Sequence, residues 1–266
     1  MTKLLSKDFG WSIKKENATA YATACLEVDI DNFRKDSGYR KILEGGGLEV
    51  FNYFLGAIRS HDLSDLFFDN LDAFRQNDLY GNPDLFSDKE IGKFSPTTLK
   101  YALNILNIIE AFDKTKINKI VEIGGGYGGI AVILQNFIDY DEYVLVDLPE
   151  CNLLTEKYIS KFPSLDGKVK TVNCHDLDYD FTNTDLTIAI NSLSECNREV
   201  QLRYFRDIIK ESRYGYLVRN IDKQSCLDDH KQGLDILPDN YLFDDTQRVE
   251  EKYSSNRIVY IKREDD

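Results

Sequence analysis

The most constraining feature of this 266-residue sequence is an apolar run that leads directly into a cluster of five glycines. The run Val121-Glu122-Ile123 is followed by Gly124-Gly125-Gly126-Tyr127-Gly128-Gly129. A buried strand that enters such a turn brings its backbone close to whatever lies beyond the strand, because no Cβ atom stands in the way. The pattern therefore predicts an α/β unit with a ligand site at the carboxyl end of this strand.

A second apolar run, Tyr143 to Val146, ends in the carboxylate of Asp147. Strand, glycine turn, helix, strand and acid form the layout of a nucleotide-type cofactor site, and two interpretations compete for it. Gly124-x-Gly126-x-x-Gly129 together with Asp147 fits the dinucleotide fingerprint of an NAD-dependent oxidoreductase. Glu122-x-Gly124-x-Gly126-x-Gly128 equally resembles the first motif of class I S-adenosylmethionine-dependent methyltransferases.

Three features favour S-adenosylmethionine over NAD. Glu122 is a carboxylate inside an apolar strand, a costly place unless it is hydrogen-bonded; the resemblance implies an acid here that supports the glycine loop and the cofactor's ammonium end. The motif begins deep in the chain, whereas a dinucleotide unit commonly opens its domain. The strand pattern Arg257 to Lys262, after the extended run Gln247 to Lys252, resembles the terminal hairpin of methyltransferases.

Composition limits the classes of partner. Hydrophobic residues make up 42% of the chain and aromatic residues 12%, enough for a folded core. A formal net charge of −13 argues against nucleic acid and against an anionic membrane surface as partners. The five cysteines contain no C-x-x-C pair, and neither a membrane span nor a signal-peptide core is evident. We therefore expect a soluble cytoplasmic protein.

The period of the apolar pattern changes near residue 116. Residues 1–115 are predicted to be helical, with helices over 39–58 and 99–112, whereas strands and helices alternate over 116–266. Strands are predicted over 117–123, 142–146, 169–173, 185–191 and 214–220, followed by the terminal hairpin. The pattern predicts a doubly wound, mostly parallel, seven-stranded Rossmann-like sheet. The N-terminal helices are expected to pack on it as a lid or as the surface of a homodimer.

Four short runs together resemble the sugar O-methyltransferase family of class I methyltransferases. They are Ser95 to Tyr101, Glu122 to Gly129, Val146 to Glu150 and Asn191 to Glu195, and the similarity covers about residues 75–262. The family usually has arginine where Lys100 stands and methionine where Cys196 stands. The resemblance implies methyl transfer to a hydroxyl of a nucleotide sugar or a glycan precursor of a surface polysaccharide. Another small acceptor, an NAD-dependent oxidoreductase and a non-catalytic cofactor-binding subunit are the alternatives.

The resemblance also implies which residues bind the cofactor. Asp147 is expected to accept hydrogen bonds from both ribose hydroxyls, since one carboxylate can take two. Asp176 is expected at the adenine amino group, Leu148 and Leu177 against the ring, and Asn191 and Ser192 at the methionine end. The complete expected set is Glu122, Gly124, Gly125, Gly126, Tyr127, Gly128, Asp147, Leu148, Asp176, Leu177, Asn191 and Ser192.

Transfer to a sugar hydroxyl needs a base, because the hydroxyl must lose its proton in the transition state. The candidates are His230, in the segment after the fifth strand, and Glu195, just past the fourth, which could instead orient His230. Tyr80, Asn82 and Asn220 are the candidate substrate contacts. The adjacent acid pairs at 228–229 and 244–245 are expected to be solvated, so no metal site is predicted.

Overall fold

The computed structural model describes residues 4–6, 8, 10–11, 14–27, 29–44, 46–220, 241–244, 248–250 and 255–263, with only the backbone described at 220 and between 241 and 257. Helices are α1 (Lys15–Glu27), α2 (Ser37–Arg40), α3 (Leu48–Arg59), α4 (Ser64–Phe68), α5 (Leu71–Arg75), α6 (Pro96–Ala111), α7 (Gly129–Leu134), α8 (Pro149–Ile159) and α9 (Arg198–Asp207). Short 3₁₀ helices are η1 (Phe33–Lys35), η2 (Gln76–Asp78), η3 (Lys114–Lys116), η4 (Pro163–Leu165), η5 (Leu193–Glu195) and η6 (Ile209–Glu211). Strands are β1 (Phe86–Asp88), β2 (Gly92–Phe94), β3 (Lys119–Ile123), β4 (Glu142–Asp147), β5 (Val169–Asn173), β6 (Thr184–Ile190), β7 (Ser212–Asn220), β8 (Tyr241–Asp244), β9 (Arg248–Glu250) and β10 (Ser255–Arg263).

The main sheet has the strand order β5-β4-β3-β6-β7-β10-β8, with β9 also paired to β10. The strands β5, β4, β3, β6 and β7 are parallel, and β10 is antiparallel to its three neighbours. Among the described residues, this sheet thus has eight strands rather than the predicted seven, because β8 and β9 pair with successive stretches of β10. The doubly wound, mostly parallel arrangement itself agrees with the prediction.

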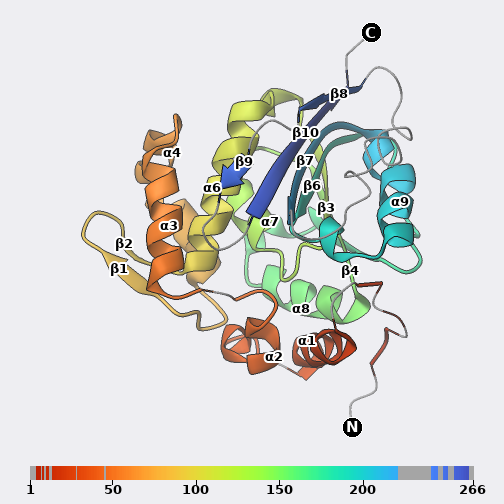
Figure 1. Cartoon of the computed structure of the whole chain (residues 1–266), viewed down its shortest axis with the longest axis horizontal. Coiled ribbons are helices and arrows are strands. Elements are labelled where there is room, and N and C mark those ends of the chain that lie inside the picture. Colours follow the sequence, from red (N-terminus) through yellow and green to blue (C-terminus); the bar gives the residue numbers. More distant parts are fainter. Residues whose placement is uncertain are drawn as a thin grey trace.

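Helices cover both faces of this sheet, so side chains that alternate along each strand enter two separate cores. Val121 and Ile123 pack with residues of α9, whereas Ile120 lies in the larger core with α6, α7 and α8. Figure 1 shows α9 on one side of the sheet and α6 and α7 on the other. Burial on both faces explains why the parallel strands read as continuous apolar runs.

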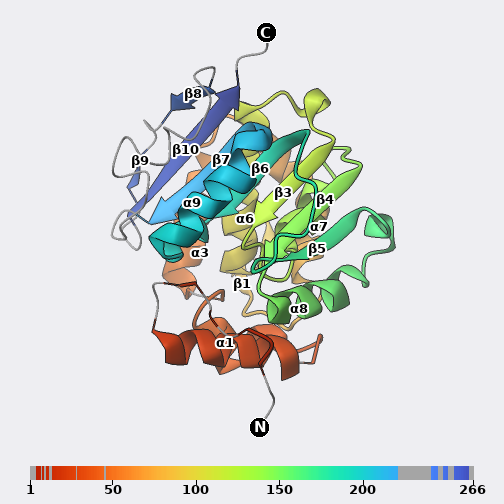
Figure 2. The same cartoon turned by 90° about the vertical axis from the view of Figure 1, so that its right-hand side faces the viewer.

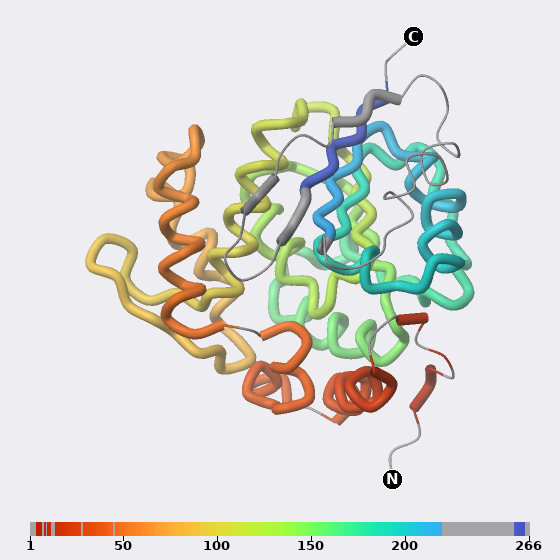
Figure 3. The backbone as a smooth tube through the Cα atoms, viewed as in Figure 1, coloured from red at the N-terminus to blue at the C-terminus, as the bar shows by residue number. Residues whose placement is uncertain are grey.

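The N-terminal helices share the larger core with the sheet. Tyr21 of α1, Phe33 of η1 and Phe54 of α3 belong to the same buried cluster as the inward residues of β3 and β4. In Figure 2, α1 lies beyond the carboxyl ends of the parallel strands, and Figure 3 traces the red N-terminal helices against the green α8. These helices are therefore placed at the edge of the sheet where the sequence predicts a site.

Two parts of the N-terminal region differ from the prediction. The expected helix over residues 39–58 is broken, since α2 ends at Arg40 and α3 begins only at Leu48 after the glycine-rich stretch 45–47. The antiparallel hairpin β1–β2 was not predicted, because its three-residue strands are too short to give an alternating pattern. Helix α6 begins as predicted, with the Ser95 hydroxyl accepting from the Thr98 amide and Pro96 in the first turn.

Candidate functional site

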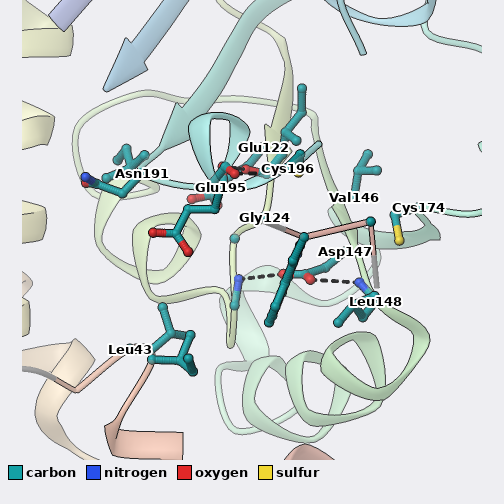
Figure 4. Close-up of a pocket in the computed structure, with 18 of the residues that line it drawn as sticks. Leu43, Glu122, Gly124, Val146, Asp147, Leu148, Cys174, Asn191, Glu195 and Cys196 are labelled. Atoms are coloured by element: carbon teal, nitrogen blue, oxygen red, sulfur yellow. Dashed lines mark hydrogen bonds between the residues drawn. The ribbon is translucent and has the colours of Figure 1, made fainter. Parts of the chain in front are cut away.

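A cavity of about 220 Å³ lies at the carboxyl ends of β3, β4 and β6. Strand β3 stands between β4 and β6, and the chain order reverses there, which is where doubly wound sheets bind their ligands. The three strand ends contribute Gly124, Asp147 and Asn191 to its wall. Figure 4 shows these residues around the cavity, with the Glu195 side chain projecting into it.

The glycine loop after β3 forms the floor of the cavity and is held in a fixed conformation. Gly124, Gly126 and Gly128 have φ values of +72°, +60° and +88°, which favour glycine. A Cβ at Gly124 would lie 2.3 Å from the Cβ of Ser192. The Gly124 amide donates to the Val146 carbonyl at 2.8 Å, and the Thr155 hydroxyl donates to the Gly126 carbonyl at 2.6 Å.

Asp147 ties the end of β4 to the glycine loop. One carboxylate oxygen accepts from the Gly126 amide at 2.9 Å and the other from the Leu148 amide at 2.7 Å. The side chain is buried, and burial raises the pKa of Asp147 to about 6 in spite of these two bonds. Each carboxylate oxygen has a second lone pair, so the residue can still accept hydrogen bonds from a ligand.

Glu122 is the second carboxylate of the cavity wall. It lies at the centre of the sheet, opposite Leu145 on β4 and Ile188 on β6, and only 3% of it is exposed. Its oxygen Oε2 accepts a 2.7 Å hydrogen bond from the Tyr143 hydroxyl. Burial raises the pKa of Glu122 to about 7, so this site favours any cationic group that can share the carboxylate.

Most of the predicted cofactor residues lie together around this cavity. Those that line it are Glu122, Gly124, Gly125, Gly126, Asp147, Leu148, Asn191 and Ser192. Tyr127 and Gly128 do not line it: the Tyr127 ring is fully buried behind the loop, where its hydroxyl accepts from Asn77 at 2.9 Å.

Asp176 and Leu177 also lie outside the cavity, contrary to expectation. The turn after β5 is tight, since the Asn173 carbonyl accepts from both of their amides. Asp176 is exposed as a result, and Leu177 packs toward the core that contains α9. The preceding residues Cys174 and His175 line the cavity instead.

The candidate catalytic and substrate residues are only partly brought together. Glu195 lines the cavity. Neither Tyr80 nor Asn82 lines the cavity. Tyr80 packs against the rings of Tyr158 and Phe162, and the exposed Asn82 donates to Asn32. His230 and the side chain of Asn220 lie outside the described residues.

The N-terminal segment forms a wall of the cavity that the sequence did not predict. Asp8, Gly10 and Trp11 line the cavity, and Trp11 forms a β-bridge with Cys196. The segment is fastened to α8 at Glu150, which accepts from the amides of Leu5 and Ser6 at 2.7 Å each and from the Ser6 hydroxyl at 2.6 Å. No local sequence pattern predicts this wall, because it depends on packing between residues that lie far apart in the sequence.

One face of α6 supplies another part of the wall. Thr97, Lys100 and Tyr101 are spaced at helical intervals, and all three line the cavity. The resemblance singled out this stretch without giving its residues a role. Together with Glu195, they add polar side chains to a wall that also contains the glycine loop and Asp147.

Two further observations concern metals and membranes. In the described part of the chain, no group of three or more His, Cys, Asp or Glu side chains is arranged to hold a metal ion. None of the helices described combines the length and apolar character needed to cross a membrane.

Sequence comparison with models of protein families and with curated proteins finds no match. Among solved structures, the chain is similar to TrmK of M. capricolum in complex with S-adenosyl-homocysteine, with 14% identity over 60% of this chain and 67% of that one and a TM-score of 0.46. It is similar to the methyltransferase domain of bacterial CtHen1, with 8% identity over 61% and 99% and a TM-score of 0.48. It is also similar to the O-methyltransferase NcsB1 of neocarzinostatin biosynthesis, bound to S-adenosylmethionine and 2-hydroxy-5-methyl naphthoic acid. The identity is 12% over 64% of this chain and 58% of that one, and the TM-score is 0.45.

Proposed function

We propose that this protein is an S-adenosylmethionine-dependent methyltransferase whose acceptor is a sugar hydroxyl. The assignment of the cofactor rests on the buried carboxylate of Glu122 beside the glycine loop, with Asp147 on the next strand. A cationic ammonium group matches Glu122, and a pair of ribose hydroxyls matches the remaining lone pairs of Asp147. The sugar acceptor rests on the family resemblance of the four motifs.

The surroundings of α7 support S-adenosylmethionine over NAD. A dinucleotide places its pyrophosphate at the N-terminus of the helix that follows the glycine loop. Here that end of the helix does not border the cavity: a Cβ at Gly129 would meet Asn77, Tyr101 and Tyr127 at 2.3, 2.6 and 2.9 Å. Glu122 would also repel a phosphate group, whereas it attracts an ammonium group.

The side chains around the cavity divide the work of methyl transfer. When bound, the cofactor supplies the activated methyl group, so the protein's part is alignment and removal of the acceptor proton. Glu122, Asp147 and the loop Gly124–Gly126 would hold the cofactor. Glu195 is the candidate base among the residues described, with His230 as the other candidate.

Calorimetry with S-adenosylhomocysteine, S-adenosylmethionine and NAD tests the cofactor. We expect the first two to bind and NAD to give no heat; tight NAD binding without S-adenosylhomocysteine binding would refute the proposal. A mass-spectrometric screen of nucleotide sugars and simple glycosides for the gain of one methyl group then tests the acceptor. Cofactor binding with no methylated product from any sugar would favour another small acceptor or a non-catalytic subunit.

A further inference from the structure

We propose that Arg34, in the N-terminal region, is a positioning residue that fixes the cofactor-binding wall of the cavity from behind. The inference rests on the proposed function for the identity of the ligand. The connection that Arg34 makes between the glycine loop and the N-terminal helices does not depend on that function, because it consists of contacts among the described residues.

The Arg34 side chain is fully buried, and all of its donors are used. Nε and Nη2 donate to the two oxygens of Glu44 at 2.6 and 3.2 Å. Nη1 donates to the Asn77 carbonyl at 2.8 Å and to Asp78 at 3.1 Å, and Nη2 also donates to the Ser95 hydroxyl at 3.0 Å. A guanidinium has five N–H groups in a fixed plane, so these five bonds specify both its place and its orientation.

One branch of this network leads to the glycine loop. The Arg34 guanidinium lies 5.3 Å from the centre of the Tyr127 ring, within the range of a cation–π contact. Asn77, whose carbonyl accepts from Arg34, donates from its side chain to the Tyr127 hydroxyl at 2.9 Å. Tyr127 follows Gly126 directly, so the ring and hydroxyl of one loop residue are both held by the N-terminal region.

A second branch leads to other residues that line the cavity. Glu44 accepts from the Thr97 hydroxyl at 3.1 Å, and Thr97 lines the cavity. The neighbour of Glu44, Leu43, also lines the cavity, 2.7 Å from where a Cβ on Gly126 would stand. Arg34 thus connects the floor of the cavity, through Tyr127, with Thr97 and with the stretch Leu43-Glu44, and both Thr97 and Leu43 line the cavity.

These connections explain why the glycine cluster contains a tyrosine. Tyr127 does not line the cavity, but its ring and hydroxyl connect the loop to the N-terminal region. In a precise binding site, the residues that contact the ligand are generally held in place by buried residues packed behind them. Loss of Arg34 would therefore loosen the loop at Gly126 and leave Glu44 and Asp78 as buried acids without their cation.

The decisive variant is Arg34→Lys, which keeps the charge but cannot make five planar hydrogen bonds. Its matched control is Tyr216→Phe, which deletes a fully buried hydroxyl bonded to Asn104 at 2.8 Å and Asn107 at 3.1 Å, away from the cavity. Both variants should lower the unfolding temperature, so stability alone does not distinguish a positioning role from a structural one.

Two readouts make the distinction. In calorimetry, Arg34→Lys should raise the Kd for S-adenosylhomocysteine by at least about tenfold, while Tyr216→Phe leaves it unchanged. In ligand-free protein, the Gly126 amide is bonded to Asp147 and the Gly128 amide to the Gly125 carbonyl. Hydrogen exchange of both amides should accelerate in Arg34→Lys and not in Tyr216→Phe. Unchanged affinity and unchanged exchange in folded Arg34→Lys would overturn the proposal, as would equal effects in the control.

A gentler variant decides the matter if Arg34→Lys does not fold. Tyr127→Phe keeps the ring but removes the bond from Asn77, and should raise the Kd about threefold while accelerating exchange in the loop. No change in either quantity would overturn the proposal. If the wild-type protein binds no S-adenosylhomocysteine, the proposed function fails, yet the exchange measurement still tests the role of Arg34.

Discussion

At the scale of single residues, the two buried carboxylates of the cavity differ in how their charge is stabilised. Asp147 accepts from two backbone amides, whereas the only bond described for Glu122 comes from the Tyr143 hydroxyl. Burial dominates in both cases and raises their pKa values, to about 6 for Asp147 and about 7 for Glu122. Of these two carboxylates, Glu122 is therefore the one whose charge changes closer to neutral pH when the cavity holds no ligand.

This difference predicts a pH dependence of cofactor binding. An ammonium group beside Glu122 favours its charged form, so affinity for S-adenosylhomocysteine should rise between pH 6 and 8 as Glu122 loses its proton, by up to about tenfold per pH unit below its pKa of about 7. Calorimetry across this range measures the effect. Glu122→Gln should bind more weakly and flatten the dependence; a flat wild-type profile would show that no cation meets this carboxylate.

The raised pKa of Glu122 has the opposite effect on the stability of the ligand-free protein, which should fall as the pH rises. The folded-state pKa of Glu122 is raised above its ordinary value of 4.5, so its contribution to stability is fully present below about pH 4.5 and is lost as the pH rises through about 7. We expect Glu122→Gln, which stays neutral, to lose less stability than the wild type between pH 5 and 8. Thermal unfolding of both proteins across this range measures the difference.

The choice of base is also made by single residues. If Glu195 takes the acceptor proton, Glu195→Gln should lower turnover by about a hundredfold or more with cofactor affinity unchanged, and His230→Ala should do little. If His230 is the base, the effects reverse, and wild-type activity should fall on the acid side near pH 6.5, the ordinary imidazole pKa of about 6.5. Full activity in both variants would exclude both residues.

At the scale of elements, the glycine loop depends on backbone conformation and close contact together. Gly124→Ala places a side chain at a φ of +72° and within 2.3 Å of Ser192, so it should abolish cofactor binding and destabilise the fold. Gly167→Ala is the matched control, since its φ is +74° but nothing lies within 4 Å of the added Cβ. That variant should cost about 1–2 kcal/mol of unfolding free energy and leave binding intact, as calorimetry and denaturant unfolding would measure.

The elements were predictable where a strong local pattern coincides with burial. Strand β5 was predicted with the observed bounds, and β3, β4, β6 and β7 to within two residues, because buried parallel strands are apolar on both faces. Strand β8 and the hairpin β1–β2 were missed, since short edge strands carry little periodicity. Edge pairing is decided by tertiary contacts, which a single sequence does not display.

At the scale of the whole molecule, some residues of the site were predictable from local patterns and others were not. The residues at strand ends, such as Gly124, Asp147 and Asn191, were predictable because parallel strands deliver their carboxyl ends to one edge. Trp11 and Leu43 were not, because their place in the wall depends on how the N-terminal region packs against the sheet. The division into residues 1–115 and 116–266 remains a prediction, and the two parts share one buried core.

That packing predicts a global response to ligand. Because Trp11 lines the cavity, a bound ligand should stabilise the N-terminal segment against local opening. Limited proteolysis should then cut near Lys14 and Lys15 more slowly when S-adenosylhomocysteine is present. Cleavage at an exposed site away from the cavity, such as Lys89 in the β1–β2 hairpin, provides the internal reference. Equal slowing at both sites, or none, would contradict this coupling.

The attachment of the N-terminal segment to Glu150 also has a kinetic consequence. Glu150 is fully buried beneath the segment, and water would solvate its carboxylate as soon as the three hydrogen bonds from Leu5 and Ser6 part. Opening therefore exchanges those bonds for hydration, at a net cost of about 1.5–3 kcal/mol for each bond to a carboxylate. We therefore expect the bonds at Glu150 to slow the departure of Trp11 from the cavity wall, and with it the exit of a bound ligand.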